Sequence, residues 1–225
     1  EYGMTLRSGE MLYHGAPRAL GNKIRDNNNT LLSQPPIKSQ AGLTTEGGLV
    51  FFHQEMGTAA NFARQYRTDR SRPYDDQVGP MDRGNVFGYQ VDRPLKIVST
   101  NYKLNEKEAE LLNKELNTSK IEPGMTLQYV ATDWSSNIGV KYPGYKATNY
   151  KDGKPLLNLD VDPPRPYVDT MTTPWPTILN LLKFDGFYND FTSDSGAPQI
   201  ALAMGDLQTE LMYSKTDIPA ELEST

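Results

Sequence analysis

The chain has 225 residues, a formal charge of −5, and contents of 37% hydrophobic, 23% charged and 10% aromatic residues. Its length suffices for a core that needs neither disulfides nor metal, and its composition is that of a globular protein rather than a disordered chain or a coiled coil. With no Cys and only two His, the chain cannot form disulfides, thiolate zinc sites or a three-histidine zinc site, so we expect no metal.

The N-terminal half is predicted to alternate strands and helices. Apolar runs bounded by Gly, Pro and Asn indicate strands, and apolar residues recurring three or four positions apart indicate helices. Strands are expected over residues 10–14, 49–52, 85–91 and 95–99, and helices over 17–27 and 57–67. Only Asp92-Arg93-Pro94 separates the strands 85–91 and 95–99, so these either pair with each other or run on past a bulge.

The clearest helix signal begins at Asn105. Asn105 followed by Glu108 is the pattern of an N-cap with an acid at the third helical position, and three leucines form an apolar stripe up to about residue 117. The region 123–176 is rich in Gly, Pro, Tyr and Asp, so it is expected to be an extended insertion or a loop-rich subdomain. Loops on a fixed scaffold carry specificity, and we place target recognition there.

The C-terminal part is predicted to return to alternating elements. A helix is expected over 177–183, with strands at 184–188, 199–204 and 208–213. The order of elements indicates a mixed α+β fold. We expect a single domain over residues 1–225 that carries the Pro/Tyr-rich insertion at about 123–176.

Several common chemistries have no motif in this sequence. The glycine loops GxGxxG and GxxxxGK[ST] are absent, which argues against nucleotide binding of the Rossmann or P-loop kind. No GxSxG occurs, and no pair among the 28 acids stands out as a glycosidase pair. The acidic balance argues against an anionic membrane surface, and no apolar run approaches the roughly 20 residues that cross a bilayer.

Three short segments stand in a fixed order instead. They are Tyr13-His14-Gly15, then Phe51-Phe52 with Ala59-Ala60-Asn61-Phe62, and finally Gln199-Ile200-Ala201-Leu202. This pattern resembles the ADP-ribosyltransferase fold of the poly(ADP-ribose) polymerase and diphtheria-toxin type, in which His, Tyr and Glu lie on three strands of a split antiparallel β-core. The resemblance implies NAD as the substrate that is cleaved, with no metal.

The first two segments would bind NAD if the resemblance holds. It implies that His14 touches the adenosine ribose and that the backbone of Gly15 meets the nicotinamide amide. Phe51 and Phe62 take the places of aromatic residues that frame the nicotinamide. Stacking requires only a π-face, which phenylalanine supplies, and a cationic ring over an aromatic face gains about 0.5 to 2 kcal/mol.

The third segment departs from the family at its central residue. The resemblance puts Gln199 where the family has a glutamate that polarises a ribose hydroxyl, and an amide does this less well than a charge. Ala16 and Ala59 also stand where the family has hydroxyl residues that bind nicotinamide. Relatives without the glutamate transfer a single ADP-ribose or are inactive, so transfer of one unit is expected rather than polymer formation.

A second carboxylate is open as a substitute for that glutamate. Gln208-Thr209-Glu210 is similar to the Gln-x-Glu motif of the cholera and clostridial types of ADP-ribosyltransferase, so Glu210 is a second candidate catalytic residue. His53 is expected to lie at the surface or to support the site from behind. Taken singly, each of these residues is more typical of a turn or a core than of a ligand site.

Three functions therefore stay open. The first is an NAD-dependent mono-ADP-ribosyltransferase, a transferase acting as a toxin or effector, that modifies a macromolecular target. We expect that target to be a protein, with nucleic acid left open, and the enzyme to be a monomer with no membrane partner. The second is a catalytically inactive ADP-ribosyltransferase-like binding or structural module of a viral or secreted assembly. The third is an unrelated structural β-rich domain, and the cellular location is left open.

Overall fold

A computed structural model describes most of the predicted elements. The described residues are 2–16, 18–31, 44–45, 49–64, 84–132, 150–151, 154–155, 157–158, 165–166, 172–173, 175–189 and 199–214. The chain is mixed α+β with a large, mostly antiparallel sheet, as its sequence predicts. It separates into two compact units, whereas we expected one domain with an insertion at about 123–176. Unit 1 comprises Glu1–Ser33, Leu49–Ser99 and Phe184–Thr225, and unit 2 comprises Gln34–Gly48 and Thr100–Lys183.

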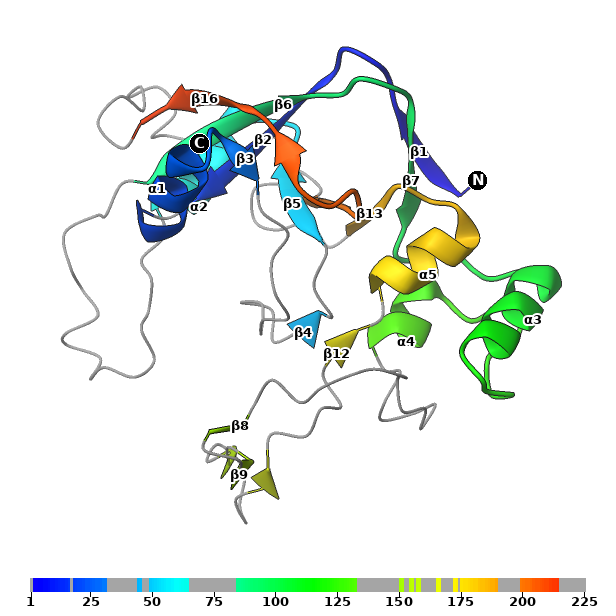
Figure 1. Cartoon of the computed structure of the whole chain (residues 1–225). Coiled ribbons are helices and arrows are strands. Elements are labelled where there is room, and N and C mark those ends of the chain that lie inside the picture. The colour runs from blue at the N-terminus through cyan, green and yellow to red at the C-terminus, as the bar shows by residue number, and fades with distance from the viewer. Residues whose placement is uncertain are drawn as a thin grey trace. The chain divides into compact units, whose positions relative to one another are not determined.

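Unit 1 is built on one eight-stranded sheet (Figure 1). In spatial order its strands are β1 (Gly3–Leu6), β7 (Leu95–Ser99), β13 (Gly186–Asn189), β14 (Gln199–Leu202), β5 (Val50–His53), β2 (Met11–Ala16), β6 (Asn85–Gln90) and β16 (Glu210–Tyr213). The pairing of β13 with β7 is parallel, and the other pairings in this sheet are antiparallel. The strands predicted at 10–14, 49–52 and 199–204 therefore lie side by side.

A continuous two-stranded ribbon spans the sheet from one side to the other. Leu6 pairs with Leu95 in β1 and β7, and Met11 pairs with Gln90 in β2 and β6. Both strands advance five residues between these pairs, so the register is unchanged across the bend. Of the two alternatives for the segments 85–91 and 95–99, the second is therefore correct: they run on, because each already has a partner in residues 3–16. We did not predict β1 from the sequence.

The three strands β13, β14 and β5 connect the two halves of this ribbon. The turn before β13 is fixed to β7 by Asp185, whose carboxylate accepts hydrogen bonds from the Lys96 backbone N–H at 2.8 Å and from Arg93 at 3.0 Å. The Asp185 carbonyl in turn accepts a bond from the Ala203 N–H, at the end of β14. One side chain thus fixes where β13 enters the sheet.

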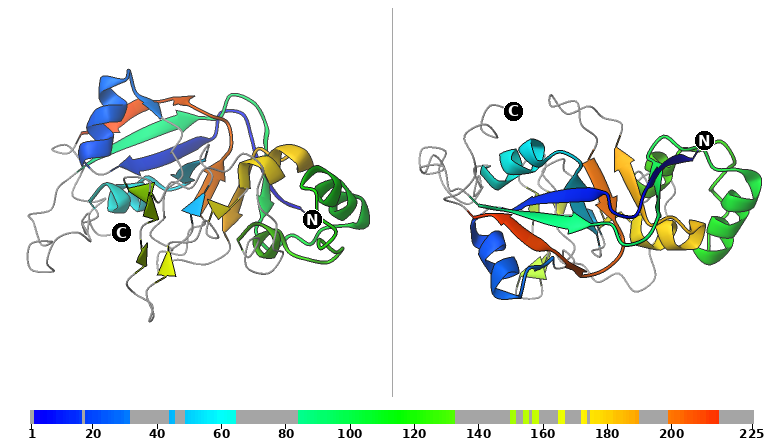
Figure 2. Two further views of the ribbon diagram at one scale, coloured as in Figure 1. Left: turned by 60° about the horizontal axis from the view of Figure 1, so that its bottom comes forward. Right: turned by 90° about the horizontal axis from the view of Figure 1, so that it is seen from above.

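The two faces of this sheet are covered by different helices. α1 (Arg18–Asp26) lies on one face and α2 (Met56–Arg64) on the other, as both views in Figure 2 show. We call these the α1 face and the α2 face. Both helices occur where they were predicted, and the expected continuation of the second to residue 67 lies outside the described residues.

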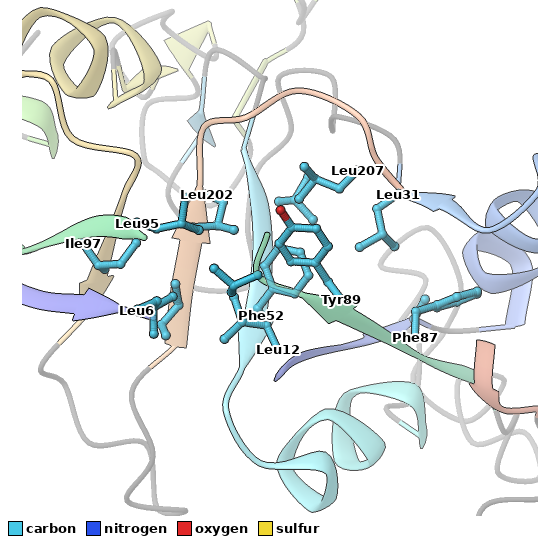
Figure 3. Packing of buried hydrophobic residues seen from close by; sticks show 14 of the residues in the cluster. Leu6, Leu12, Leu31, Phe52, Phe87, Tyr89, Leu95, Ile97, Leu202 and Leu207 are labelled. Carbon is cyan, nitrogen blue, oxygen red and sulfur yellow. The ribbon is translucent and has the colours of Figure 1, made fainter. Parts of the chain in front are cut away.

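The main core lies on the α1 face (Figure 3). Side chains alternate between the faces of a strand, so every second residue of β2, β5 and β14 points into this core. The largest buried side chains that meet there are Leu6, Leu12, Ile24, Leu31, Phe52, Phe87, Leu95 and Ile97. Two short strands close its edge, β3 (Thr30–Leu31) and β15 (Leu207–Gln208), which pair with each other.

A smaller core on the α2 face depends on close approach of helix and strand. Ala59, Ala60 and Ala63 of α2 are fully buried there with Val86. A Cβ on Gly15 would lie 1.7 Å from the Ala59 carbonyl oxygen, so only glycine allows α2 to come this near to β2. The glycine of the Tyr13-His14-Gly15 segment therefore has a packing role in addition to any role in binding.

Unit 2 holds the remaining helices, α3 (Glu106–Glu115), α4 (Leu127–Thr132) and α5 (Trp175–Leu182). The predicted capping box of α3 is confirmed, because the Asn105 side chain accepts from the Glu108 N–H and the Glu108 carboxylate accepts from the Asn105 N–H, both at 2.9 Å. α4 was not predicted, since six residues are too few for a helical period to be recognised. Much of the region 123–176, and with it the expected target recognition, lies outside the described residues.

Four short strand pairs complete the description. The pair β3 and β15 belongs to unit 1. Those of unit 2 are β4 (Thr44–Thr45) with β12 (Thr172–Thr173), β8 (Tyr150–Lys151) with β9 (Lys154–Pro155), and β10 (Leu157–Asn158) with β11 (Arg165–Pro166). The parallel pair β4 and β12 shows why residues 34–48, which lie between segments of unit 1 in the sequence, belong to unit 2.

The substitution Gly15→Ala should destabilise unit 1 by at least about 2 kcal/mol, since α2 must move away from β2 to admit the methyl group. Gly9→Ala is the matched control, because no atom lies within 4 Å of its added Cβ and only its positive φ of 91° is unfavourable. We expect that control to cost about 1 kcal/mol. Urea unfolding followed by circular dichroism measures both, and equal losses would contradict the packing role of Gly15.

Candidate functional site

The three segments that resemble the ADP-ribosyltransferase pattern lie on the adjacent strands β2, β5 and β14. Tyr13 of β2 pairs with His53 of β5, and His53 pairs in turn with Gln199 of β14. Residues directly opposite each other in antiparallel strands point to the same face, so these three side chains form one row across the sheet on the α2 face. Segments separated by up to 186 positions in the sequence, from Tyr13 to Gln199, thus meet in one row.

The sheet is split between β2 and β5. β2 pairs with β6 over six residues, from Met11 to Ala16, but with β5 at Tyr13 alone. The two strands therefore separate beyond this pair, toward Ala16 on one side and Val50 on the other. Beyond Tyr13 the described residues of β2 and β5 therefore form no further ladder pair with each other.

His14 bridges this split. Its Nδ1 lies 2.6 Å from the carbonyl oxygen of Phe51 in β5. A carbonyl oxygen only accepts hydrogen bonds, so Nδ1 carries the proton and Nε2 of the neutral ring has a free lone pair. Burial lowers the pKa of His14, while the bond to Phe51 acts in the opposite direction. The ring packs edge-on against Phe52, with centroids 6.0 Å apart, so it lies on the α1 side of β2.

The predicted aromatic residues lie on the α2 face. The Phe51 ring meets Phe187 of β13 edge-on at 6.5 Å between centroids. Phe62 of α2 stacks on His53 at 4.6 Å with 23° between the ring planes. Both rings are partly exposed, and one face of Phe62 is already covered. Phe51 and Phe62 are therefore placed on the same side of the sheet as Gln199, whereas the His14 ring lies on the other side, the α1 face, and reaches β5 across the split from there.

His53 is the residue that the sequence did not single out. It is 5% exposed, so of the two positions expected for it the surface one is wrong, and its Nδ1 is buried with no hydrogen-bond partner among the described residues. The physical reason is the row described above, which turns His53 under α2 and against Phe62. Burial, and to a lesser extent the charge of His14, lower the pKa of His53 from 6.5 to about 4, so the ring is neutral at pH 7. Only its place directly after Phe51-Phe52 could have drawn attention to it.

The two candidate catalytic residues are far apart. Glu210 of β16 pairs with Gly88, and Gly88 pairs with Tyr13, so Glu210 lies in the same row as Gln199. Four strand spacings separate them, which is about 19 Å. Glu210 is also exposed at the edge of the sheet. It cannot substitute for a carboxylate at position 199, so one site does not contain both residues.

The two alanines that depart from the resembled pattern are buried. Ala16 belongs to the core on the α1 face and Ala59 to the core on the α2 face, and both are 0% exposed. Neither can donate a hydrogen bond from its side chain. These two positions therefore supply no polar side-chain contact.

The described residues carry neither a metal-ligand cluster nor a membrane-spanning helix. Within them, no group of three His, Asp or Glu side chains is placed to hold a metal ion. None of the helices described is long and apolar enough to cross a membrane.

The buried His53 should make stability depend on pH. Its pKa is about 4 when folded and 6.5 when unfolded, so the unfolded chain binds more protons between these values. The unfolding free energy should therefore fall as pH decreases from 6.5 toward 4. Urea unfolding at several pH values should be measured for the parent protein and for His53→Phe. The difference between their pH slopes isolates the contribution of His53, because all other groups titrate in both proteins. Equal pH slopes would contradict the assigned burial.

Comparison with other proteins assigns no family to this site. No protein-family model matches the chain, and no curated protein matches it. Its function must therefore be inferred from its own residues and their geometry.

Proposed function

We propose that the chain is an NAD-dependent mono-ADP-ribosyltransferase, which transfers ADP-ribose from NAD to a macromolecular target and releases nicotinamide. The observation that carries this proposal is the adjacency of β2, β5 and β14, which bear His14, Phe51 and Gln199 respectively. The short segments that carry the resemblance, which are far apart in the sequence, lie on neighbouring strands of one sheet. The split between β2 and β5, with His14 across it, adds support.

NAD would lie along this split. The free Nε2 of His14 is a hydrogen-bond acceptor for a hydroxyl of the adenosine ribose, because Nδ1 is committed to Phe51. The nicotinamide would lie against Phe51 and the uncovered face of Phe62, with its amide at the backbone of Gly15. A pyridinium ring over aromatic faces is favoured by cation–π attraction.

The reaction breaks the bond between ribose C1′ and the nicotinamide nitrogen. Nicotinamide leaves with the bonding electron pair, and positive charge develops on the ribose ring. An acceptor nucleophile then bonds to C1′ and releases its proton. Gln199 would orient a ribose hydroxyl through its amide, and a neutral amide stabilises the cationic transition state less than a carboxylate. Transfer of a single unit at a modest rate is the outcome that this chemistry favours.

The substitution His14→Ala should abolish NAD binding and transfer. It removes both the Nε2 acceptor and the bridge to Phe51. Incubation with labelled NAD and a cell extract, followed by measurement of labelled protein and free nicotinamide, tests transfer, and calorimetry tests binding. Glu210→Gln is the matched control and should leave both unchanged, since Glu210 lies about 19 Å from Gln199. If the parent protein neither binds nor cleaves NAD, the proposed function is wrong.

The substitution Gln199→Glu should increase nicotinamide release about tenfold. A carboxylate makes a hydrogen bond roughly twice as strong as that of a neutral amide, and about 1.4 kcal/mol of additional transition-state stabilisation is a factor of ten. Single-turnover release of nicotinamide measures the chemical step. An unchanged rate in a protein that binds NAD would mean that residue 199 does not lie beside the bond that breaks.

A second candidate is an inactive ADP-ribosyltransferase-like binding module. It is favoured by the three departures at Ala16, Ala59 and Gln199, two of which are fully buried and supply no polar group. The same assay separates the candidates. NAD binding that depends on His14, without nicotinamide release from either the parent protein or Gln199→Glu, would identify the module.

A further inference from the structure

In the proposed reaction the neutral amide of Gln199 would hold the ribose hydroxyl without the help of a carboxylate. A second hydrogen-bonding side chain in the same row could strengthen this contact. The charged or titratable members of that row are His53, Tyr13 and Glu210; His53 is directly paired with Gln199, Tyr13 lies one strand further away, and Glu210 is too distant. We propose that His53 contacts the ligand and that its Nδ1 hydrogen-bonds the ribosyl 2′-hydroxyl of NAD, the hydroxyl next to the bond that breaks. This inference rests on the proposed function and assigns a residue that the resemblance does not.

The position of His53 fits this role. Gln199 and His53 are directly paired on neighbouring strands, so their Cβ atoms lie about 4.5 to 5.5 Å apart on the same face. Two side chains at this separation can bond one hydroxyl together. The neighbouring residue on the same face of β5 is Phe51, which would frame the nicotinamide. A ligand that contacts Phe51 and Gln199 therefore passes His53.

The hydrogen bonding of His53 also points to a ligand. Its Nδ1 is buried and has no partner in the described part of the chain, and the side chain is 5% exposed. Buried polar atoms in proteins nearly always have a partner, because an unsatisfied one costs about 1 to 3 kcal/mol. A ligand hydroxyl would remove this penalty. A hydroxyl both donates and accepts, so it suits Nδ1 in either tautomer.

Contacts within the protein orient the His53 ring. Stacking on Phe62 at 4.6 Å fixes its plane, and Tyr13 follows on the next strand. The low pKa of about 4 keeps the ring uncharged at neutral pH, so it does not repel the cationic nicotinamide ring. An uncharged imidazole and an uncharged amide would together replace one carboxylate. His53 forms no covalent bond and keeps its own protonation state throughout.

The test uses two substitutions of His53 in the whole chain. His53→Phe retains an aromatic ring against Phe62 and removes the polar atom, whereas His53→Asn places an amide atom near the position of Nδ1. Calorimetry would measure the dissociation constants for NAD and for an NAD analogue that lacks the 2′-hydroxyl on its nicotinamide ribose. We expect His53→Phe to bind NAD about tenfold more weakly and His53→Asn to recover most of that loss.

The analogue distinguishes a direct contact from a structural effect. The parent protein should bind it about tenfold more weakly than NAD, and His53→Phe should bind both ligands equally, because the contact is already lost. Two outcomes would overturn the assignment of His53 and leave the proposed function standing. In one, the affinity losses from His53→Phe and from removal of the 2′-hydroxyl add up independently. In the other, His53→Phe binds NAD as tightly as the parent protein does. A parent protein that does not bind NAD would overturn both.

A measurement on the unsubstituted protein keeps the assignment testable if the variants unfold. The chain has only two His, so its imidazole nitrogens give a simple nitrogen-15 NMR spectrum after histidine labelling. Addition of NAD should change the chemical shift of His53 Nδ1. The chemical shift of His14 Nδ1 should change little, since that atom already hydrogen-bonds the Phe51 carbonyl. An unmoved His53 Nδ1 resonance at saturating NAD would contradict the proposal.

Discussion

The hydrogen bond from His14 Nδ1 to the Phe51 carbonyl is the contact on which this site depends. β2 and β5 pair at one position only, so this bond holds the two strands at a fixed separation beyond it. It also sets the tautomer of His14 and leaves Nε2 free. This 2.6 Å contact orients the imidazole and links β2 to β5 beyond their single ladder pair.

The packing around this bond explains why the split persists. A bent ribbon carries β2 and β6 at one end and β1 and β7 at the other, and three strands connect its two halves. The position of β5 is thus set by β14 on one side and by α2 above it. The Cβ-free Gly15 lets that helix lie directly against β2. β5 therefore cannot move closer to β2 without disrupting two cores.

The site carries little charge for one that would cleave a glycosidic bond. Position 199 holds an amide, His53 is neutral, and Glu210 is four strands away. Such a site can bind and orient a ligand through neutral hydrogen bonds and aromatic faces. For the proposed reaction, its transition-state stabilisation is expected to be weaker than that of a carboxylate site.

Local patterns in the sequence were sufficient for the elements that depend on neighbouring residues. The capping box at Asn105, the helix after Phe52 and the strands at residues 85 and 95 follow from short-range periodicity and turn chemistry, so they could be predicted. The tertiary structure decided what depends on strand order and register: the ribbon that joins β6 to β7, the distance between Gln199 and Glu210, and the burial of His53. Register places a residue on one face or the other, and it is fixed by partners distant in the sequence, such as Gln199, 146 positions from its partner His53, that no local pattern contains.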